Sequence, residues 1–189
     1  MARPRSEDKR KAILEAATEV VAELGVGAPT ARIAQEAGVA EGTLFTYFAS
    51  KDELLNQLYL ELKADLSEAM KTGYPSNKSL IERSRCVWDR LIGWGLAHPL
   101  KRKAVGQLAV SERITEKSKR IGGESFEEIH KLISEIQAGG ALKDQPPAFV
   151  IAILSSIANT TMDFIAREPG RASHYTKAGF NAYWNAVTE

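Results

Sequence analysis

Five residues between positions 41 and 47 have the chemistry to contact nucleic acid, and helical spacing places them on the outer face of a short helix. Glycine has no side chain to hold a base away, and threonine and tyrosine hydroxyl groups can hydrogen-bond to phosphate oxygens and base edges. The five are Glu41, Gly42, Thr43, Thr46 and Tyr47, and Lys51 adds a positive charge one turn later. This pattern predicts the helix of a DNA-binding motif that enters a major groove.

A second short helix and a tight turn are needed to hold that face in place. The sequence predicts a helix over about 31–37, capped by Thr30, and a helix over about 41–48. Gly38 stands between them, where the chain must adopt a left-handed backbone. Both short helices have an apolar side that can be buried against a first helix, which precedes them in the chain. Ser6 can cap the start of this first helix, and Gly25 can cap its end. The apolar residues are Ile33, Ala37, Val39, Leu44 and Phe48, opposite Ile13, Ala17 and Val20.

Further DNA contacts are predicted at both ends of this segment. The N-terminal stretch is locally basic and can follow the DNA backbone or enter a minor groove. The predicted contacts beyond the five residues above are Arg3, Arg5, Thr30, Ala31, Arg32 and Lys51.

The remainder of the chain shows helical spacing of apolar residues and almost no strand signal. Ser50 with Glu53 and Ser79 with Glu82 have the spacing of capping boxes, and Pro99 suits the first turn of a helix. One helix is predicted over 115–137, a very apolar helix over 148–166, and a last helix that carries Phe180, Tyr183 and Trp184. The predicted fold is all-α, with about nine helices. We divide it by function into a helix-turn-helix domain over 1–50 and a C-terminal helical bundle over 51–189.

The composition excludes several classes of protein. The 189 residues include 25 Lys and Arg against 24 Asp and Glu, a net charge of +1, so binding through bulk positive charge is excluded. The single cysteine, Cys86, allows no internal disulfide, and a redox role for it is a minor alternative. The three histidines do not have zinc-ligand spacing, so we expect no metal and no cofactor. No apolar run reaches the roughly 18 residues of a membrane span, and the charged N-terminus does not resemble a signal peptide.

The segment I-A-Q-E-A-G-V-A-E-G-T-L-F-T-Y-F-A-S-K-D-E-L-L, residues 33–55, resembles the TetR family of transcriptional regulators. The whole chain is most similar to the multidrug-responsive repressors of the RamR type. The resemblance implies that Thr43, Tyr47 and Lys51 contact phosphates, and that Glu41 and Gly42 lie against base edges. Phe45 stands where the family commonly has a tyrosine, so any contact of that hydroxyl group is lost.

The resemblance also implies a C-terminal domain that binds a small molecule and forms a homodimer through its last two helices. A pocket for such a molecule needs aromatic side chains with an isolated polar or charged group. Asp163 is an acid within the most apolar helix, and it requires either a basic neighbour or a cationic ligand if it is buried. The predicted ligand-binding residues are Tyr59, Trp88, Trp94, Phe126, Asp163 and Phe164.

We therefore expect a ligand-responsive, DNA-binding transcriptional regulator of the bacterial cytoplasm, associated with the nucleoid. It would repress efflux or stress genes and leave a palindromic operator when a small hydrophobic or cationic compound binds. An all-α enzyme is the main alternative, but the sequence has no phosphate loop, paired Cys and His, or carboxylate pair that supports catalysis. A third possibility is a helix-turn-helix that contacts proteins, or an activator that needs no ligand.

Overall fold

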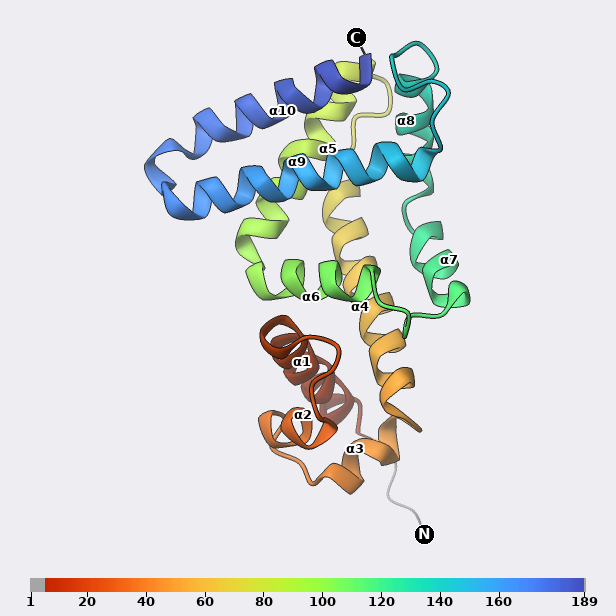
Figure 1. Ribbon diagram of the computed structural model, residues 1–189, viewed down its shortest axis with the longest axis vertical. Helices are drawn as coiled ribbons and strands as arrows, with labels where there is room; N and C mark the ends of the chain where they lie inside the picture. Colours follow the sequence, from red (N-terminus) through yellow and green to blue (C-terminus); the bar gives the residue numbers. More distant parts are fainter. Residues whose placement is uncertain (1–5, 189) are drawn as a thin grey trace. The chain divides into compact units, whose positions relative to one another are not determined.

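The computed structural model describes residues 6–188, and within that range it contains ten α-helices, one short 3-10 helix and no strand (Figure 1). The all-α prediction is confirmed. The helices are α1 (Glu7–Leu24), α2 (Thr30–Glu36), α3 (Glu41–Tyr47), α4 (Lys51–Lys71), α5 (Leu80–Ala97), α6 (Pro99–Ala109), α7 (Glu116–Glu124), α8 (Glu127–Gln137), α9 (Pro147–Arg167) and α10 (Ala172–Thr188), with η1 (Pro169–Arg171) between the last two.

The extra helix arises because the predicted single helix over 115–137 is two helices. Helix α7 ends at Glu124, and α8 begins at Glu127. The hydroxyl group of Ser125 donates to the Gly122 carbonyl at 3.0 Å, and Phe126 is buried in a separate hydrophobic core from the residues before it. The chain therefore changes its packing partners at Ser125, although neither proline nor glycine stands at the break.

The contacts within the chain form two compact units, and their limits differ from the functional division at residue 50. The first unit runs up to Asp65 and includes His98–Ser125, and the second comprises Leu66–Ala97 and the chain from Phe126 onward. The boundary thus falls inside α4. The functional division into 1–50 and 51–189 remains a prediction, because it concerns what the two parts bind.

The first unit is built around α1, whose apolar side is almost wholly buried. Ile13, Ala17 and Val20 pack with Ile33, Leu44 and Phe48, as the sequence predicts, while Ala37 and Val39 are partly buried at the edge of this core. Helix α6 packs along α1 in the same unit and adds Ala104 and Leu108 to the core. The helix-turn-helix therefore shares one hydrophobic core with α6.

The core of the second unit is centred on Trp88 of α5, which is fully buried. Its indole ring stacks on Tyr183, with ring centroids 6.1 Å apart, and meets the edge of Phe180. Helices α9 and α10 run side by side in opposite directions as a hairpin, with α5 and α8 packed against the pair (Figure 1). Gly179 lies where α10 passes Trp88, because a Cβ atom at this position would be 2.8 Å from Cζ2 of the indole.

Helix α9 is long and apolar enough to cross a membrane by length and composition, although the sequence predicts no such segment. The prediction counted uninterrupted apolar residues, whereas α9 alternates them with uncharged polar ones such as Ser155, Ser156 and Thr160. Only 33% of its most apolar window is buried within the chain. Much of the helix surface is therefore available to a partner.

Candidate nucleic-acid interface

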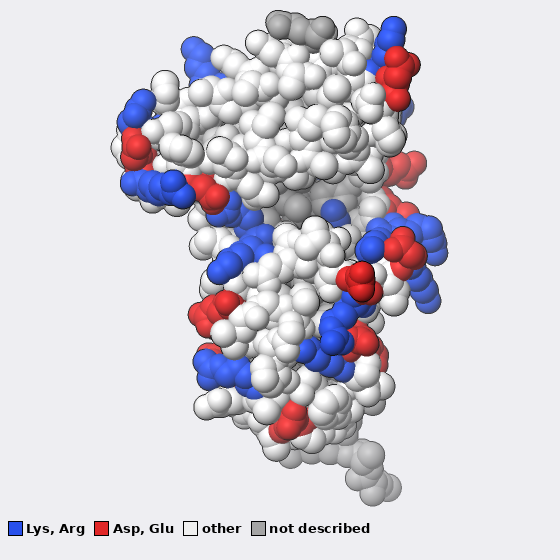
Figure 2. Space-filling model, viewed as in Figure 1, with Lys and Arg blue, Asp and Glu red and all other residues white. Residues whose placement is uncertain are grey.

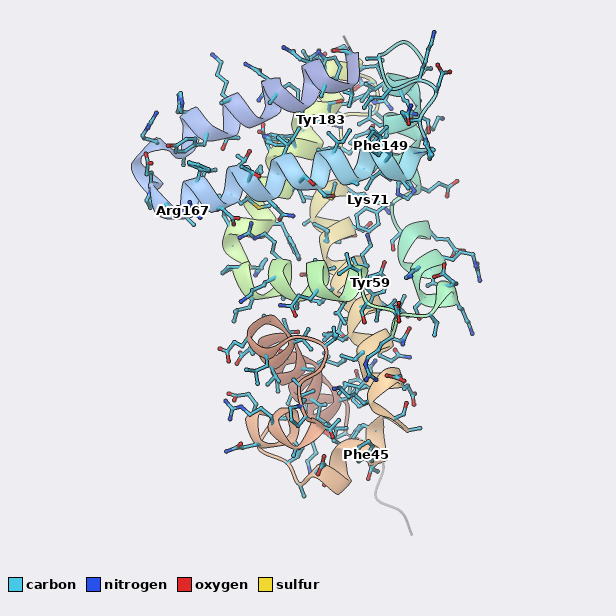
Figure 3. The ribbon with its side chains drawn as sticks, in the orientation of Figure 1. Phe45, Tyr59, Lys71, Phe149, Arg167 and Tyr183 are labelled. Carbon is cyan, nitrogen blue, oxygen red and sulfur yellow. The ribbon has the colours of Figure 1, made fainter. Side chains whose placement is uncertain are left out.

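Helices α2 and α3 and the turn between them form the predicted helix-turn-helix. Gly38 has φ +64°, which is the left-handed conformation that favours glycine. The Val39 N–H donates to the Ala34 carbonyl at 2.9 Å and fixes the turn against the end of α2. Leu44 is buried under α3, and Glu41, Gly42, Phe45 and Thr46 are exposed on its other side, where Figure 3 labels Phe45.

Among residues 6–188, nothing in the packing requires a glycine at position 42. A Cβ atom built at this position meets no other atom within 4 Å, and its φ is not positive. A side chain would therefore be accommodated, and its absence leaves backbone accessible at the start of α3. This accessibility allows a close approach to a base edge.

A hydrogen bond between the two helices orients the carboxylate of Glu41. The Thr30 hydroxyl group donates to Glu41 Oε1 at 2.6 Å, so the carboxylate is drawn toward the start of α2. The prediction that Thr30 caps α2 is wrong, because Pro29 is the capping residue and Thr30 is already helical. Arg32 is exposed but paired with Glu36 of the same helix at 3.1 Å, and Ala31 is exposed beside it.

Tyr47 joins the end of α3 to the start of α1. Its hydroxyl oxygen accepts a hydrogen bond from the Ser6 N–H at 3.1 Å. A phenol can accept and donate at once, so the hydroxyl hydrogen remains able to donate to a phosphate oxygen. Ser6 is the N-cap residue of α1, as predicted, although its side chain makes no capping hydrogen bond. Thr46 directs its hydroxyl group to the Gly42 carbonyl at 3.2 Å, and Thr43 is half-buried.

Lys51 begins α4, where the predicted capping box forms. The Ser50 hydroxyl oxygen accepts from the Glu53 N–H at 3.1 Å, and Glu53 Oε2 accepts from the Ala49 N–H at 2.7 Å. Partial burial lowers the pKa of the Lys51 ammonium group, and the nearby Arg113 guanidinium lowers it further, while Asp52 opposes the shift. Arg113 lies in a basic stretch of the sequence, residues 99–120, for which a second DNA contact is an alternative and a solvated helix face is favoured. The remaining two predicted contacts, Arg3 and Arg5, lie outside the described residues.

The six predicted ligand-binding residues are divided between the two units. Tyr59 belongs to the first unit, where it is buried and where burial raises the pKa of its phenol. The other five belong to the second unit. Three are buried, namely Trp88, Trp94 and Phe126, and the Trp88 N–H donates to the Thr176 carbonyl at 3.1 Å. Asp163 and Phe164 are exposed on α9, so Asp163 is not a buried acid.

A groove of about 430 Å³ runs between α9 and α10 on the surface of the second unit. Phe164 and Tyr175 lie at one end of it, and small residues of α10 form its floor. The small residues are Ala178, Gly179 and Ala182, which face Ser156, Ile157, Thr160 and Thr161 of α9. These three residues of α10 were not predicted, although their spacing of one to four positions places Ala178 and Ala182 on one face of the helix. Of the predicted ligand-binding residues, the groove includes Phe164 alone.

Comparisons with known proteins agree with this geometry. The sequence profile described as "Bacterial regulatory proteins, tetR family" matches residues 13–58, which include α2, α3 and the start of α4. The HTH-type transcriptional regulator YhgD of Bacillus subtilis is 35% identical over 78 residues, which are 39% of this chain and 41% of that protein. The chain therefore matches less than half the length of that relative.

Solved structures extend the similarity over the whole chain. A tetR family transcription regulator from Shewanella sp. PV-4 is 30% identical with a TM-score of 0.83, over 98% of this chain and 100% of that chain. LfrR from Mycobacterium smegmatis, solved with proflavine, has a TM-score of 0.67 at 18% identity and covers 97% of this chain and 99% of its own. FadR from Bacillus subtilis, solved with stearoyl-CoA, has a TM-score of 0.66 at 16% identity. The match covers 94% of this chain and 98% of the FadR chain. The last two share the fold, and the first shows that this chain belongs to the TetR family of bacterial transcriptional regulators.

Proposed function

We propose that the chain represses transcription by binding a palindromic operator as a homodimer, and that a small molecule releases it. The observation that carries the DNA-binding part is the outer face of α3. This face is exposed, has an unobstructed glycine at position 42, and ends at the Tyr47 hydroxyl group, which can donate to a phosphate. Glu41 and Gly42 would read base edges, while Thr43, Tyr47 and Lys51 would contact the backbone.

The second part of the proposal is a homodimer through α9 and α10. These helices present a wide surface that is nearly free of charged side chains except at its edges (Figure 2). Phe149 and Phe164 are 49% and 41% exposed on α9, whose first and last turns are marked by Phe149 and Arg167 in Figure 3. A second copy related by two-fold symmetry would cover this surface and fill the groove beside Ala178 and Ala182. This symmetry matches a palindromic operator.

The third part of the proposal concerns the ligand. LfrR and FadR, which share the fold, were solved with proflavine and stearoyl-CoA respectively. We infer that this chain responds to a small hydrophobic or cationic compound that favours a dimer conformation in which the two α3 helices no longer match the half-sites. Efflux or stress genes as targets, the similarity to RamR-type repressors, and action at the nucleoid in the bacterial cytoplasm remain predictions. The proposal includes no catalytic step.

A binding experiment tests the DNA-binding part. Duplexes that contain a palindrome are selected from a random pool by the wild-type protein, and affinities are then measured by gel shift for Tyr47→Ala and Lys51→Ala. We expect both variants to bind more weakly on all selected sequences, because phosphate contacts do not depend on base sequence. Lys131→Ala is the matched control, since Lys131 is an exposed lysine of α8. Unchanged affinity of both variants would contradict the assignment of this face.

A sedimentation experiment tests the dimer. Ala182→Arg places a charged side chain in the groove without disturbing the core of the chain, because Ala182 is exposed. We expect this variant to be monomeric at concentrations at which the wild type is dimeric. Ala141→Arg, in the exposed loop before α9, is the control and is expected to remain dimeric. Proflavine and stearoyl-CoA, added separately to the protein–DNA complex, test the release step.

A further inference from the structure

The segment that connects α6 and α7, residues 110–115, is fastened to the start of α4 within the first unit. Asn56 of α4 holds its backbone from both sides, because its Nδ2 donates to the Arg113 carbonyl at 2.9 Å and its Oδ1 accepts from the Thr115 N–H at 3.0 Å. Ile114, between these two residues, is 2% exposed and belongs to the same core as the helix-turn-helix. The segment is therefore part of the unit that carries α2 and α3.

This attachment places a second cation beside Lys51. The Arg113 guanidinium pairs with Asp52, with Nη1 2.6 Å from Oδ1, and its side chain remains 47% exposed. It lies close enough to the Lys51 ammonium group to be one of the causes of the lowered pKa of that group. Arg113 is thus paired with Asp52, next to Lys51 in the chain, and both Arg113 and Asp52 act electrostatically on the Lys51 ammonium group.

Two backbone N–H groups at this turn are already bonded within the chain. Ser50 and Glu53 use the capping box to satisfy the N–H groups of Glu53 and Ala49. Lys51 and Arg113 would place two positive charges beside any anion held at this corner. A phosphate oxygen between them would relieve their mutual repulsion, and arginine suits this role because its planar guanidinium can bind phosphate while keeping one donor on Asp52.

We propose that Arg113 is a second phosphate-binding cation, which acts with Lys51 on the DNA backbone next to the helix-turn-helix. The proposal rests on the proposed function, because it takes the face of Lys51 to be the face that meets DNA. Its partner is the sugar-phosphate backbone of a duplex, without base specificity. Because Arg113 comes from the α6–α7 segment and not from the helix-turn-helix, any change in that segment changes the affinity for DNA directly.

The test uses the dependence of DNA affinity on salt concentration. The full-length protein and its variants are titrated onto a selected duplex of about 30 base pairs, which accommodates two half-sites, at several salt concentrations. Each phosphate contact contributes about 0.9 to the slope of log affinity against log salt. We expect Arg113→Ala to reduce the slope by about 0.9 per protomer, as Lys51→Ala does, and Arg113→Lys to restore most of it.

Two further variants separate a direct contact from a general effect on charge or folding. Arg120→Ala is the matched control, because Arg120 is an exposed arginine of the same unit that is also paired with an acid, Glu124. It is expected to leave the slope close to that of the wild type. Asn56→Ala removes the side-chain hydrogen bonds to the Arg113 carbonyl and the Thr115 N–H without removing a charge. It should weaken DNA binding toward the level of Arg113→Ala, while circular dichroism shows an intact helical fold.

The outcomes distinguish this inference from the proposed function. A wild-type protein that selects no duplex, or a Lys51→Ala variant with an unchanged slope, would overturn the proposed DNA-binding face. If Lys51→Ala reduces the slope and Arg113→Ala matches Arg120→Ala, the inference about Arg113 is wrong and the DNA-binding face stands. A reduced slope for Arg113→Ala with restoration by lysine supports the inference.

Discussion

Replacing Gly179 with alanine is expected to destabilise the second unit, although alanine favours helices. Gly179 lies in the interior of α10, and its missing side chain allows α10 to pack against both α9 and α5. The new Cβ atom would be 2.8 Å from Trp88 Cζ2 and would also overlap Thr161 Oγ1. Neither neighbour can move away freely, because the Trp88 N–H is bonded to the Thr176 carbonyl and the Thr161 hydroxyl group to the Ile157 carbonyl.

The magnitude follows from two opposing contributions to the free energy of unfolding. Replacing glycine with alanine in a helix interior adds about 1 kcal/mol of stability. Forcing a methyl group into a well-packed core removes about 1–3 kcal/mol. Replacing a helical glycine that has free space around it with alanine serves as the control, because it shows the gain in helix propensity alone. Gly93 of α5 is such a position, since a Cβ atom there meets nothing within 4 Å.

Thermal unfolding of both variants measures the difference, at one protomer concentration because the midpoint of a dimer depends on concentration. Gly93→Ala is expected to unfold at a higher temperature than Gly179→Ala. In a chain of this size each kcal/mol shifts the midpoint by roughly 2–4 °C, so a difference of about 2 kcal/mol separates the variants by about 6 °C. Equal midpoints for the two variants would refute the packing assigned to α10, α9 and Trp88.

Two other predictions concern different parts of the chain. Gly122→Ala in α7 would bring a Cβ atom to 2.9 Å from Tyr59 Cε1, so urea denaturation should show it to be about 1–3 kcal/mol less stable than Gly106→Ala in α6, where the space is open. Burial raises the pKa of Tyr183 to about 12. The unfolded chain therefore loses this proton first, and stability that is fully present below pH ~10 declines above it by up to about 1.4 kcal/mol per pH unit. Tyr183→Phe should lose less stability over the same interval, and an equal loss would contradict the assignment.

Local features of this fold could be predicted from the sequence because their causes are local. Gly38 has the positive φ that the turn requires, and Ser50 and Ser79 form capping boxes with acids three residues later. The break between α7 and α8 was missed, although Ser125 and Glu128 also have capping-box spacing. Helical spacing of apolar residues resumes at Phe126, and periodicity alone does not show that neighbouring turns pack into different cores.

Contacts between residues distant in sequence could not be predicted in this way. The hydrogen bond between Ser6 and Tyr47 spans 41 positions of the sequence, and the one between Asn56 and Thr115 of the α6–α7 segment spans 59. Neither bond is indicated by the residues adjacent to its two partners. The choice of ligand-binding residues meets the same limit and stays a prediction. Aromatic residues are equally suited to a hydrophobic core and to a ligand pocket. Only the fold shows that the Trp88 side chain is buried in a core.

The small net charge of the DNA-binding region makes each cation at its surface important. Residues 1–51 contain seven basic and seven acidic side chains, so no broad positive field holds the duplex. With few phosphate contacts per protomer, removing one changes a large share of the electrostatic affinity. If Arg113 contacts phosphate as proposed, this cation from outside the helix-turn-helix would change operator affinity without any movement of α3. The effect of one such side chain on affinity would be larger in a neutral DNA-binding region than in a strongly basic one.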